Sequence, residues 1–307
     1  MSSTLSRHTV ATATPGLRWS IGAITVDRVV ESEKPALPAR VIFPTAPADA
    51  VARYQSVLGP RLFDPASECF VLSLHSFIVR TRHHTIVVDA CSGNDKERPA
   101  KPHYHHNQWP YLERFRATGV RLEDVDFVFC THLHIDHVGW NTRLENGRWV
   151  PTFPNARYLF ARTEWEHWKN EATRKAYATD PYFEDSVLPI VERGQAEFVA
   201  SDYHFEDSIW LEPSPGHTPG HSCVRLKSEG REAVMSGDLI HHPVQCFEPE
   251  WSSGFCTDPA ASARTRRAFL DRHAETDTLI MPAHFPTPSV GWVRRAGSAF
   301  RFAFDGE

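Results

Sequence analysis

One short segment, residues 131–137, constrains this chain more than any other part of its sequence. It reads Thr-His-Leu-His-Ile-Asp-His and directly follows a continuous apolar run typical of a buried strand. In an extended backbone His132 and His134 point to the same side, because side chains alternate along a strand. Once the chain turns, Asp136 and His137 can face a second position beside the first. Zinc-like metals prefer imidazole and carboxylate ligands, so the segment predicts a two-metal site.

The alternative for this segment is a surface turn that is rich in histidine by chance. The chain has 18 histidines among 307 residues, so some clustering is expected. Chance would not also place an aspartate at the spacing of a metal ligand directly after an apolar strand. We therefore interpret the segment as a metal-binding motif.

Strand-like and helix-like segments alternate along most of the chain. The apolar and β-branched pattern predicts strands at 69–80, 85–89, 125–130, 157–161, 209–212, 223–226, 233–235 and 278–281, and helices at 110–117, from 163 onward and at 259–273. Several of these strands run into a residue that can bind metal, and side chains at strand ends can converge on one edge of a sheet sandwich. We expect a flexible segment, 1–20, followed by one domain, 21–307, built from two α/β halves.

The motif and three later positions resemble the metallo-β-lactamase superfamily, whose signature is His-x-His-x-Asp-His. That family also has a histidine in a Gly-His-Thr-x-Gly-His turn, an aspartate that closes a strand in Gly-Asp, and a late histidine after a final strand. This sequence supplies His217, Asp238 and His284 in that order, and similar elements span about residues 70–300. The resemblance implies an α/β fold, the αββα sandwich, with two mixed sheets flanked by helices.

The resemblance also implies how two ions would be held. One ion would be bound by three histidines, the other by two histidines and an aspartate, and a second aspartate would bridge both: respectively His132, His134 and His217; Asp136, His137 and His284; and Asp238. Two divalent ions, two carboxylates and a hydroxide leave a net charge of about +1, which suits a developing oxyanion. We expect two divalent ions, most simply Zn²⁺, while Mn, Fe and Co accept the same ligands.

Departures from several family branches narrow the reaction. Class B β-lactamases usually lack the histidine beside the motif aspartate, flavin-linked di-iron members need a flavin domain, and the helical end of glyoxalase II has no counterpart after His284. The lactonases, including those that cleave acyl-homoserine lactones, and the methyl-parathion-type organophosphate hydrolases fit best. We expect a metal-bridging hydroxide to cleave a lactone or other carboxylic ester, with phosphotriester hydrolysis as the alternative.

Two alternatives of another class remain. Persulfide dioxygenases share the motif while using one iron, so the motif alone is compatible with a mononuclear iron dioxygenase. A non-catalytic binding protein on the same fold is the second alternative. Such a protein would be expected to have lost a ligand, yet all seven positions are filled. The enzyme interpretation is therefore preferred.

The expected catalytic residues are Asp136 and His241. His241 stands three residues after Asp238, where many lactonases carry a tyrosine that assists the carbonyl or the leaving group. An imidazole there could donate a proton to the leaving alkoxide, because its pKa lies near neutrality. The alternative is that His241 only supports Asp238.

Three further features are expected near the metals. Asp89 is a candidate acceptor for a ligand imidazole, and His221 is expected to support the turn that presents His217. The histidine-rich loop 94–109 forms either a wall or lid over the metals or a solvated loop with no role. The six cysteines show no Cys-x-x-Cys spacing and are expected to be structural.

Charge and hydropathy exclude several kinds of partner. The chain has 33 Lys and Arg against 38 Asp and Glu, a net charge of −5, which gives no general attraction to nucleic acid or to an anionic membrane. No apolar run is long enough to span a bilayer, and the first residues lack the apolar stretch of a signal peptide. We expect a cytoplasmic enzyme that acts on a small molecule, with homodimerisation left open.

Overall fold

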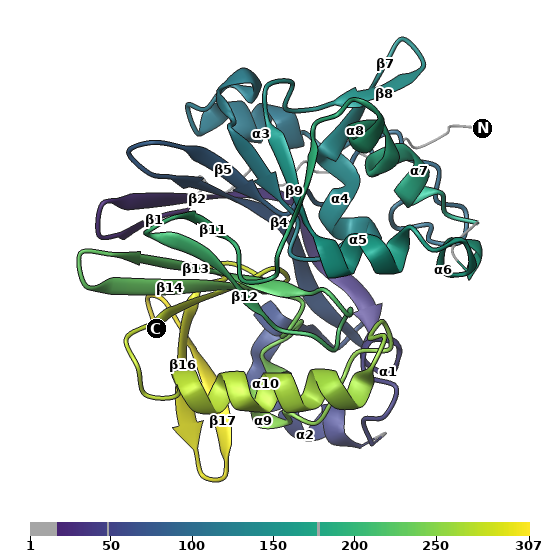
Figure 1. Cartoon of the computed structure of the whole chain (residues 1–307). Helices are drawn as coiled ribbons and strands as arrows, with labels where there is room; N and C mark the ends of the chain where they lie inside the picture. The colour runs from purple at the N-terminus through teal and green to yellow at the C-terminus, as the bar shows by residue number, and fades with distance from the viewer. Residues whose placement is uncertain (1–16, 48, 177–178) are drawn as a thin grey trace, which may run out of the picture.

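The computed structural model describes residues 17–47, 49–176 and 179–307, which form two β-sheets packed face to face (Figure 1). Among these residues the first sheet has eight strands in the order β1-β2-β4-β5-β6-β9-β10, with β3 paired to β4. Its strands are β1 (Arg18–Ile21), β2 (Ile24–Pro38), β3 (Phe63–Asp64), β4 (Cys69–Arg80), β5 (Thr85–Val88), β6 (Phe127–Phe129), β9 (Arg157–Ala161) and β10 (Ala196–Val199). The pairs β5–β6, β6–β9 and β9–β10 are parallel and the others antiparallel, so this sheet is mixed.

The second sheet runs in sequence order from β11 to β17, with seven strands in the described part of the chain. They are β11 (His204–Glu206), β12 (Ile209–Pro213), β13 (Ser222–Ser228), β14 (Arg231–Gly237), β15 (Leu279–Pro282), β16 (Gly291–Ala296) and β17 (Ala299–Phe304). Only β14–β15 is a parallel pair among the described strands of this sheet. A separate hairpin is formed by β7 (Thr142–Glu145) and β8 (Arg148–Pro151).

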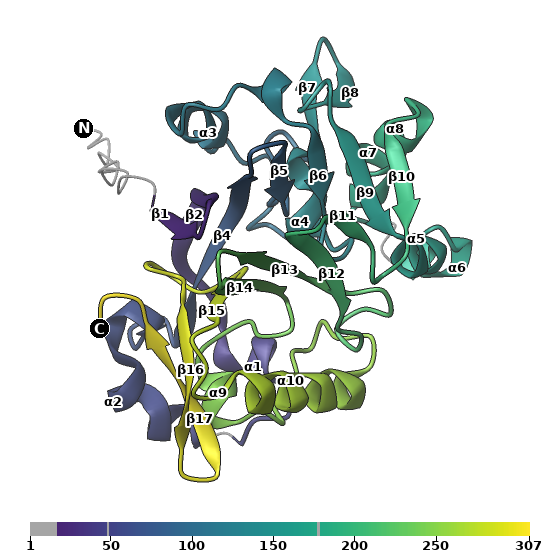
Figure 2. The same cartoon turned by 60° about the vertical axis from the view of Figure 1, so that its left-hand side comes forward.

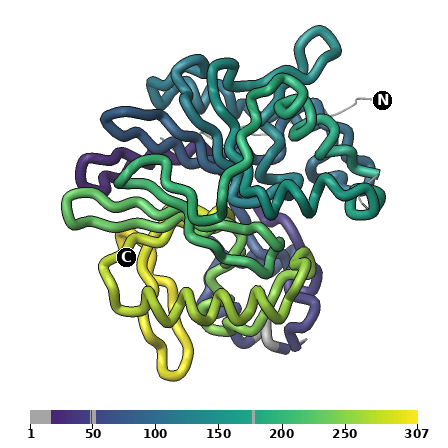
Figure 3. The backbone as a smooth tube through the Cα atoms, in the orientation of Figure 1, coloured from purple at the N-terminus to yellow at the C-terminus, as the bar shows by residue number. Residues whose placement is uncertain are grey.

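Helices cover the outer face of each sheet (Figures 1 and 2). On the side of the first sheet lie α3 (Tyr111–Ala117), α4 (Ile135–Val138), α5 (Arg162–Trp168), α6 (Glu171–Ala176), α7 (Tyr182–Ser186) and α8 (Leu188–Glu192). On the side of the second lie α1 (Ala39–Ile42), α2 (Ala50–Leu62), α9 (Val244–Phe247) and α10 (Pro259–His273). The tube in Figure 3 shows the early, purple-blue part of the chain in the same layer as the late α10, and apolar side chains of α1, α2 and α10 share one core cluster. The expected αββα sandwich with two mixed sheets is confirmed.

Both sheets are buried on both faces, which explains their continuous apolar runs. In β4, Phe77 and Val79 point into the core between the sheets, whereas Ile78 points to the cluster under the helices of the first layer. This alternation is the two-residue period of an extended chain. The strand ends that carry polar residues therefore stand on a rigid apolar base.

Most predicted elements are present, with bounds shifted by a few residues. No element was predicted before residue 69, for the hairpin β7–β8, or for β16 and β17. Of the expected flexible segment 1–20, residues 1–16 lie outside the described residues, and the strand β1 begins at Arg18. No helix in the described ranges is long and apolar enough to cross a membrane. The expected cytoplasmic location and the division into two halves stay predictions.

Candidate metal centre

All seven predicted ligands lie at the carboxyl ends of strands or on the loops that follow them. After β6 the backbone bends at Thr131 and His132, is extended at His134, with φ −76° and ψ 160°, and then enters the helical turn α4. Asp136 and His137 lie in this turn, and the ring of His137 stays close to that of His132, with centroids 4.1 Å apart. The turn between β12 and β13 supplies His217, and the loops after β14 and β15 supply the two remaining residues, Asp238 and His284.

Three imidazoles, His132, His134 and His217, form what we call the first group. The Nε2 atom of His217 lies 3.1 Å from Nε2 of His132 and 2.8 Å from Nδ1 of His134, and the latter two nitrogens are 3.0 Å apart. A ring nitrogen carries either a proton or a lone pair, so three nitrogens this close cannot all pair with one another. Around tetrahedral zinc, with bonds of 2.0–2.1 Å, ligand nitrogens stand roughly 3.3 Å apart. The first group is close to that arrangement.

The remaining side chains, Asp136, His137 and His284, form the second group. The nearest carboxylate oxygens of Asp136 lie 4.0 Å from Nε2 of His137 and 3.8 Å from Nε2 of His284. All three side chains are thus close enough to share one ion. They provide two nitrogens and a carboxylate, a ligand set that zinc and its neighbours accept.

Asp238 stands between the two groups, and each of its oxygens faces one of them. Its Oδ2 atom lies 3.2 Å from Nε2 of His217 and 3.7 Å from Nε2 of His132. Its Oδ1 atom lies 3.1 Å from Nε2 of His137 and 2.9 Å from Nε2 of His284. This is the position that a ligand shared by two ions must occupy.

Burial and charge act differently on the two groups. Burial lowers the pKa of His132 well below its usual value and that of His217 to about 3, so both present neutral lone pairs. Burial also opposes charging of His137 and His284, yet the carboxylates around them outweigh it and raise both pKa values. Burial works against the charge of Asp238 as well, but the surrounding imidazoles hold its pKa well below the usual range.

Whether these residues suit metal ions can be judged from buried polar atoms that have no hydrogen-bond partner in the described chain, because a bound ion would supply the missing partner. Both ring nitrogens of His137 and the Oδ1 atom of Asp238 are buried and lack a hydrogen bond, although they lie 3.1 Å from one another at the nearest pair. The atoms are close but not aligned as donor and acceptor. Buried atoms of this kind are rare in proteins. The Nε2 atom of His137 and the Oδ1 atom of Asp238 face each other without a hydrogen bond, and this donor set fits a bound ion.

Two residues outside the seven ligands, Asp89 and His221, make contacts of the kind that the sequence predicted for them. Asp89 Oδ2 lies 3.0 Å from Nδ1 of His137, while its Oδ1 accepts a hydrogen bond from the Thr131 backbone at 2.8 Å. His221 Nδ1 lies 2.7 Å from the Ser214 hydroxyl, and its Nε2 accepts from the backbone N–H of Asp238 at 3.0 Å. Both residues thus hold ligand-bearing segments in place.

Cys256 was expected to be an ordinary structural cysteine, and its position adds to that expectation. Its Sγ atom is half-buried and lies 3.4 Å from Nδ1 of His217. The thiol therefore contacts the back of a first-group imidazole. No sequence pattern indicates this contact, because Cys256 and His217 are brought together by the packing of the chain before α10.

His241 lies beside the shared aspartate. Its Nε2 atom is 3.2 Å from Oδ2 of Asp238, and its ring stacks on His284 with centroids 5.9 Å apart. Burial lowers the pKa of His241, so the ring is neutral near pH 7 and keeps one N–H. Neither ring nitrogen has a hydrogen-bond partner in the described chain. The catalytic role expected for His241 stays a prediction.

The loop 94–109 is packed against the second group. Tyr104 donates its hydroxyl to Oδ2 of Asp136 at 2.8 Å. The loop is anchored by Arg98, which is fully buried and makes two hydrogen bonds to Asp185 at 2.6 and 2.8 Å. The loop therefore lies as a wall beside the second group rather than as a freely solvated loop, and the expected role over bound metals stays a prediction. Sequence reasoning did not single out Tyr104.

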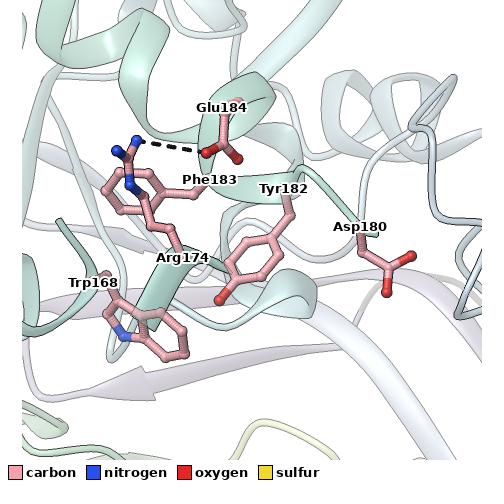
Figure 4. Close-up of a pocket in the computed structure, with 6 residues that line it drawn as sticks. All are labelled: Trp168, Arg174, Asp180, Tyr182, Phe183 and Glu184. Carbon is pink, nitrogen blue, oxygen red and sulfur yellow. Dashed lines mark ion pairs between the residues drawn. The ribbon is translucent and has the colours of Figure 1, made fainter. Parts of the chain in front are cut away.

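Two cavities lie away from the seven residues. A cavity of about 10 Å³ is lined by Trp168, Tyr182 and Phe183, with Arg174 ion-paired to Glu184 at 3.6 Å (Figure 4). Such a volume holds about one water molecule. A hollow of about 880 Å³ adjoins the amino-terminal ends of β14 and β15, whereas the metal-type residues follow their carboxyl-terminal ends. Neither cavity takes part in the metal centre.

Comparison with known proteins gives consistent results. The sequence profile of the Metallo-beta-lactamase superfamily matches residues 71–284. An N-acyl homoserine lactonase of Bacillus sp is 26% identical over 152 residues, covering 49% of this chain and 53% of that protein. The N-acyl homoserine lactonase AttM of Rhizobium radiobacter is 23% identical over 222 residues, covering 66% of this chain and 78% of its own. The aligned part of this chain thus spans about half the length of the Bacillus relative.

Two solved structures share the fold over nearly the whole chain. One is described as hydrolase AbOPH in the beta lactamase superfamily, with a TM-score of 0.80, 22% identity, and coverage of 97% of this chain and 99% of that chain. The other is AidC, a dizinc quorum-quenching lactonase in complex with a product, with a TM-score of 0.78, 18% identity, and coverage of 95% and 98%. At these identities the likeness establishes the architecture.

Proposed function

The chain belongs to the metallo-β-lactamase superfamily, and we propose that it is a dinuclear metallohydrolase that opens a lactone or cleaves another carboxylic ester. The observation that carries this proposal is the position of Asp238, whose two oxygens each face one histidine group at 2.9–3.7 Å. A single ion would leave one of these groups of buried ligands without a partner. Two groups that share one carboxylate suit a pair of ions.

The substrate class is supported by the relatives. The two curated relatives described above are N-acyl homoserine lactonases, and the solved AidC is a dizinc lactonase. Ester and lactone opening pass through an oxyanion that needs positive charge beside it. A centre of two divalent ions with two carboxylates offers such charge.

In this proposal each side chain has a defined part. The first group would hold one ion, the second group the other, and Asp238 both; we propose Zn²⁺, while Mn, Fe and Co suit the same ligands. When bound, the ions supply a hydroxide nucleophile at neutral pH and charge that stabilises the oxyanion. The protein holds the imidazoles of the first group neutral by burial, and Asp89 orients His137.

At the edges of the centre His241 can move a proton, and Tyr104 holds one against Asp136. His241 is neutral beside Asp238, and we propose that it accepts a proton as the nucleophile adds to the carbonyl and then donates that proton to the leaving alkoxide. Asp136 is the other proposed catalytic residue, held in place by the Tyr104 hydroxyl. Burial raises the pKa of Tyr104 well above its usual value, so this phenol stays protonated and remains a donor.

The test is a substrate panel on the zinc-loaded protein: an acyl-homoserine lactone, a simple lactone, a nitrophenyl ester, a phosphotriester and a β-lactam. We expect lactone opening with the largest kcat/KM, and loss of activity after chelation that zinc restores. Rapid phosphotriester cleavage without lactone opening would replace the lactonase by a phosphotriester hydrolase on the same centre. Turnover of a persulfide by a one-iron form would contradict the hydrolase altogether.

A further inference from the structure

Two buried glutamates lie outside the seven ligands. Glu164 accepts hydrogen bonds from the backbone of two ligand-bearing segments, and Glu31 from the backbone of a segment that is paired with a third. We propose that Glu164 positions the first group and Glu31 positions the second, so that each half of the centre can be weakened separately. This inference rests on the proposed dinuclear centre. Neither glutamate contacts a ligand side chain, so both act through the backbone.

Glu164 joins the two segments that supply the first group. It lies in α5 and is 1% exposed. Its Oε1 atom accepts from the backbone N–H of Leu133, between His132 and His134, at 3.0 Å, and its Oε2 atom accepts from the backbone N–H of Gly220, in the turn that carries His217, at 2.9 Å. One carboxylate thus fixes the distance between the motif and that turn.

Two further contacts tie Glu164 to the same half. Trp168 donates its indole N–H to Oε1 of Glu164 at 2.6 Å, and the Trp168 ring meets the His134 ring edge-on with centroids 5.3 Å apart. A Cβ atom on Gly220 would lie 2.3 Å from the backbone nitrogen of Glu164, so only glycine allows the turn to approach this closely. The helix α5 and the turn are therefore packed as one unit behind the first group.

Glu31 makes the corresponding link on the other side. It sits where the pairing of β2 with β4 shifts between Val30 and Ser32, and it is fully buried. A bulged residue can turn its side chain out of the normal alternation. Its Oε2 accepts from the backbone N–H and hydroxyl of Ser92 at 3.2 and 2.5 Å, and its Oε1 accepts from the backbone N–H of Gly93 at 2.9 Å.

The segment that Glu31 holds is paired with α4, which bears Asp136 and His137. The backbone N–H of Ala90 donates to the carbonyl of His137 at 2.8 Å, and that of Gly139 donates to the carbonyl of Cys91 at 2.8 Å. Oε1 of Glu31 also accepts the indole N–H of Trp140 at 2.7 Å, directly after α4. A Cβ atom on Gly139 would lie 2.0 Å from the backbone of Ser92, so the two segments touch.

Both glutamates are unusual in having donors but no cation. No ion pair joins either of them to a Lys, Arg or His within residues 17–47, 49–176 and 179–307, and their partners are backbone N–H groups, a hydroxyl and indoles. Burying a carboxylate is costly unless such bonds compensate it. Glu31 also lies outside the region 71–284 that the family profile matches. The amino-terminal strand β2 thus contributes to the second half of the centre.

The carboxylate form makes a specific substitution informative. In Glu164→Gln the amide NH₂ can replace only one oxygen, and placing it at Oε2 keeps the Leu133 and Trp168 bonds but opposes the N–H of Gly220. This cuts the link between the two segments while conserving size. In Glu31→Gln the amide opposes a backbone N–H of the segment that follows β5.

The experiment measures zinc affinity of the full chain by competition with a chelator. His284→Ala damages the second group and His132→Ala the first, so that each background reports on the other half. In the His284→Ala background we expect Glu164→Gln to lower the affinity for the remaining ion by about 10–100-fold, which is typical of changes to residues that support metal ligands. Glu31→Gln should change that affinity by less than about threefold. In the His132→Ala background the effects should be reversed: Glu31→Gln should lower the affinity for the remaining ion, and Glu164→Gln should change it little.

A second readout avoids the damaged backgrounds. In the otherwise unchanged chain, ring ¹⁵N resonances of the histidines should show the first-group imidazoles losing zinc first in Glu164→Gln, and His137 and His284 first in Glu31→Gln. Glu197→Gln, on the strand β10, is the control and should bind two ions like the parent. Equal weakening of both halves by both variants, in a parent that binds two ions, would overturn this inference alone. A parent that binds no ion would instead contradict the metallohydrolase itself.

Discussion

The first and second groups are built from the same kinds of side chain but respond differently to burial. In the first, three imidazoles face one another through ring nitrogens 2.8–3.1 Å apart, and burial keeps them neutral. In the second, two imidazoles lie among the carboxylates of Asp136, Asp238 and Asp89, which raise the pKa of His137 and His284. Without an ion, the carboxylates of the second group can balance the charge of its protonated imidazoles. The neutral imidazoles of the first group have no such partner for their ring-nitrogen lone pairs.

This difference indicates how many protons each ion must displace when it binds. An ion entering the first group meets lone pairs already free, so it displaces few protons. An ion entering the second group must displace protons held by His137 and His284, since only neutral imidazole binds metal. The two halves should therefore differ in affinity as the pH falls, although they share Asp238.

The largest effect is expected from the shared residue. Asp238→Ala removes the carboxylate whose two oxygens each face one group, so neither group should keep its present geometry. We expect at least one ion to be lost. We also expect kcat/KM to fall by more than the roughly 10–100-fold caused by changes to residues that only support metal ligands. Metal analysis and kinetics on the same preparation measure both. A variant that keeps two ions and near-parental turnover would show that Asp238 is not shared.

Substitution of His241 tests whether this residue takes part in catalysis or only supports Asp238. A lactone expels an alkoxide that needs a proton, whereas a nitrophenolate leaves almost unaided. His241→Phe should therefore lower lactone turnover by about 10²–10⁴-fold and leave nitrophenyl-ester turnover within several-fold. Similar losses on both substrates would mean that His241 acts by supporting Asp238.

Glu31 should give the second half a pH-dependent stability. Burial raises its pKa from 4.5 to about 7, against the opposing effect of its hydrogen bonds, so the folded chain holds this proton more tightly than the unfolded chain. The stabilisation is complete below pH 4.5 and is lost as the pH rises through 7. Relative to Glu31→Gln, the parent's free energy of unfolding should fall by about 3 kcal/mol over this range.

Urea unfolding of the parent and of Glu31→Gln in parallel, from pH 4 to pH 9, measures this difference. A flat difference would mean that Glu31 stays ionised throughout, held so by its four donors. That result would leave its contact with the second half intact and would remove only the pH dependence.

Tyr104 should have the smallest effect of the four. Tyr104→Phe removes one hydrogen bond to Asp136 without changing the shape of the loop 94–109. A hydrogen bond to a charged group contributes about 1.5–3 kcal/mol, and a bound ion would take over part of it, so we expect about a tenfold loss of affinity for the second ion. The first group should be unaffected. An equal change in both halves would show that the loop acts on the whole centre.

The sequence predicted the parts of the centre that depend on local spacing. The motif can be recognised because an apolar strand, two alternating histidines and a turn are neighbours in the chain. Tyr104 could not be found in this way, because its position depends on the bonds of Arg98 to Asp185, which lie 87 residues apart. Glu31 depends on a shift in strand pairing, and Glu164 on a turn 56 residues away.

The elements before residue 69 were missed for a related physical reason. The strand β2 is long and pairs with β4 through two irregularities, so its pattern of apolar and polar residues is interrupted. The four-residue α1 and the kinked α2 place apolar side chains in the core cluster of the second layer, and no local pattern reveals this packing. Local periodicity therefore located the ligand-bearing strands and not the supports behind them.

The central claim is that two ions share Asp238, and the most direct test is the number of metal ions per chain. The purified protein, loaded with zinc and freed of excess by gel filtration, should contain close to two zinc ions per chain by elemental analysis. Asp238→Ala, treated in the same way, should contain one or none. A parent that is fully active with a single tightly bound iron would contradict this account and favour a mononuclear dioxygenase.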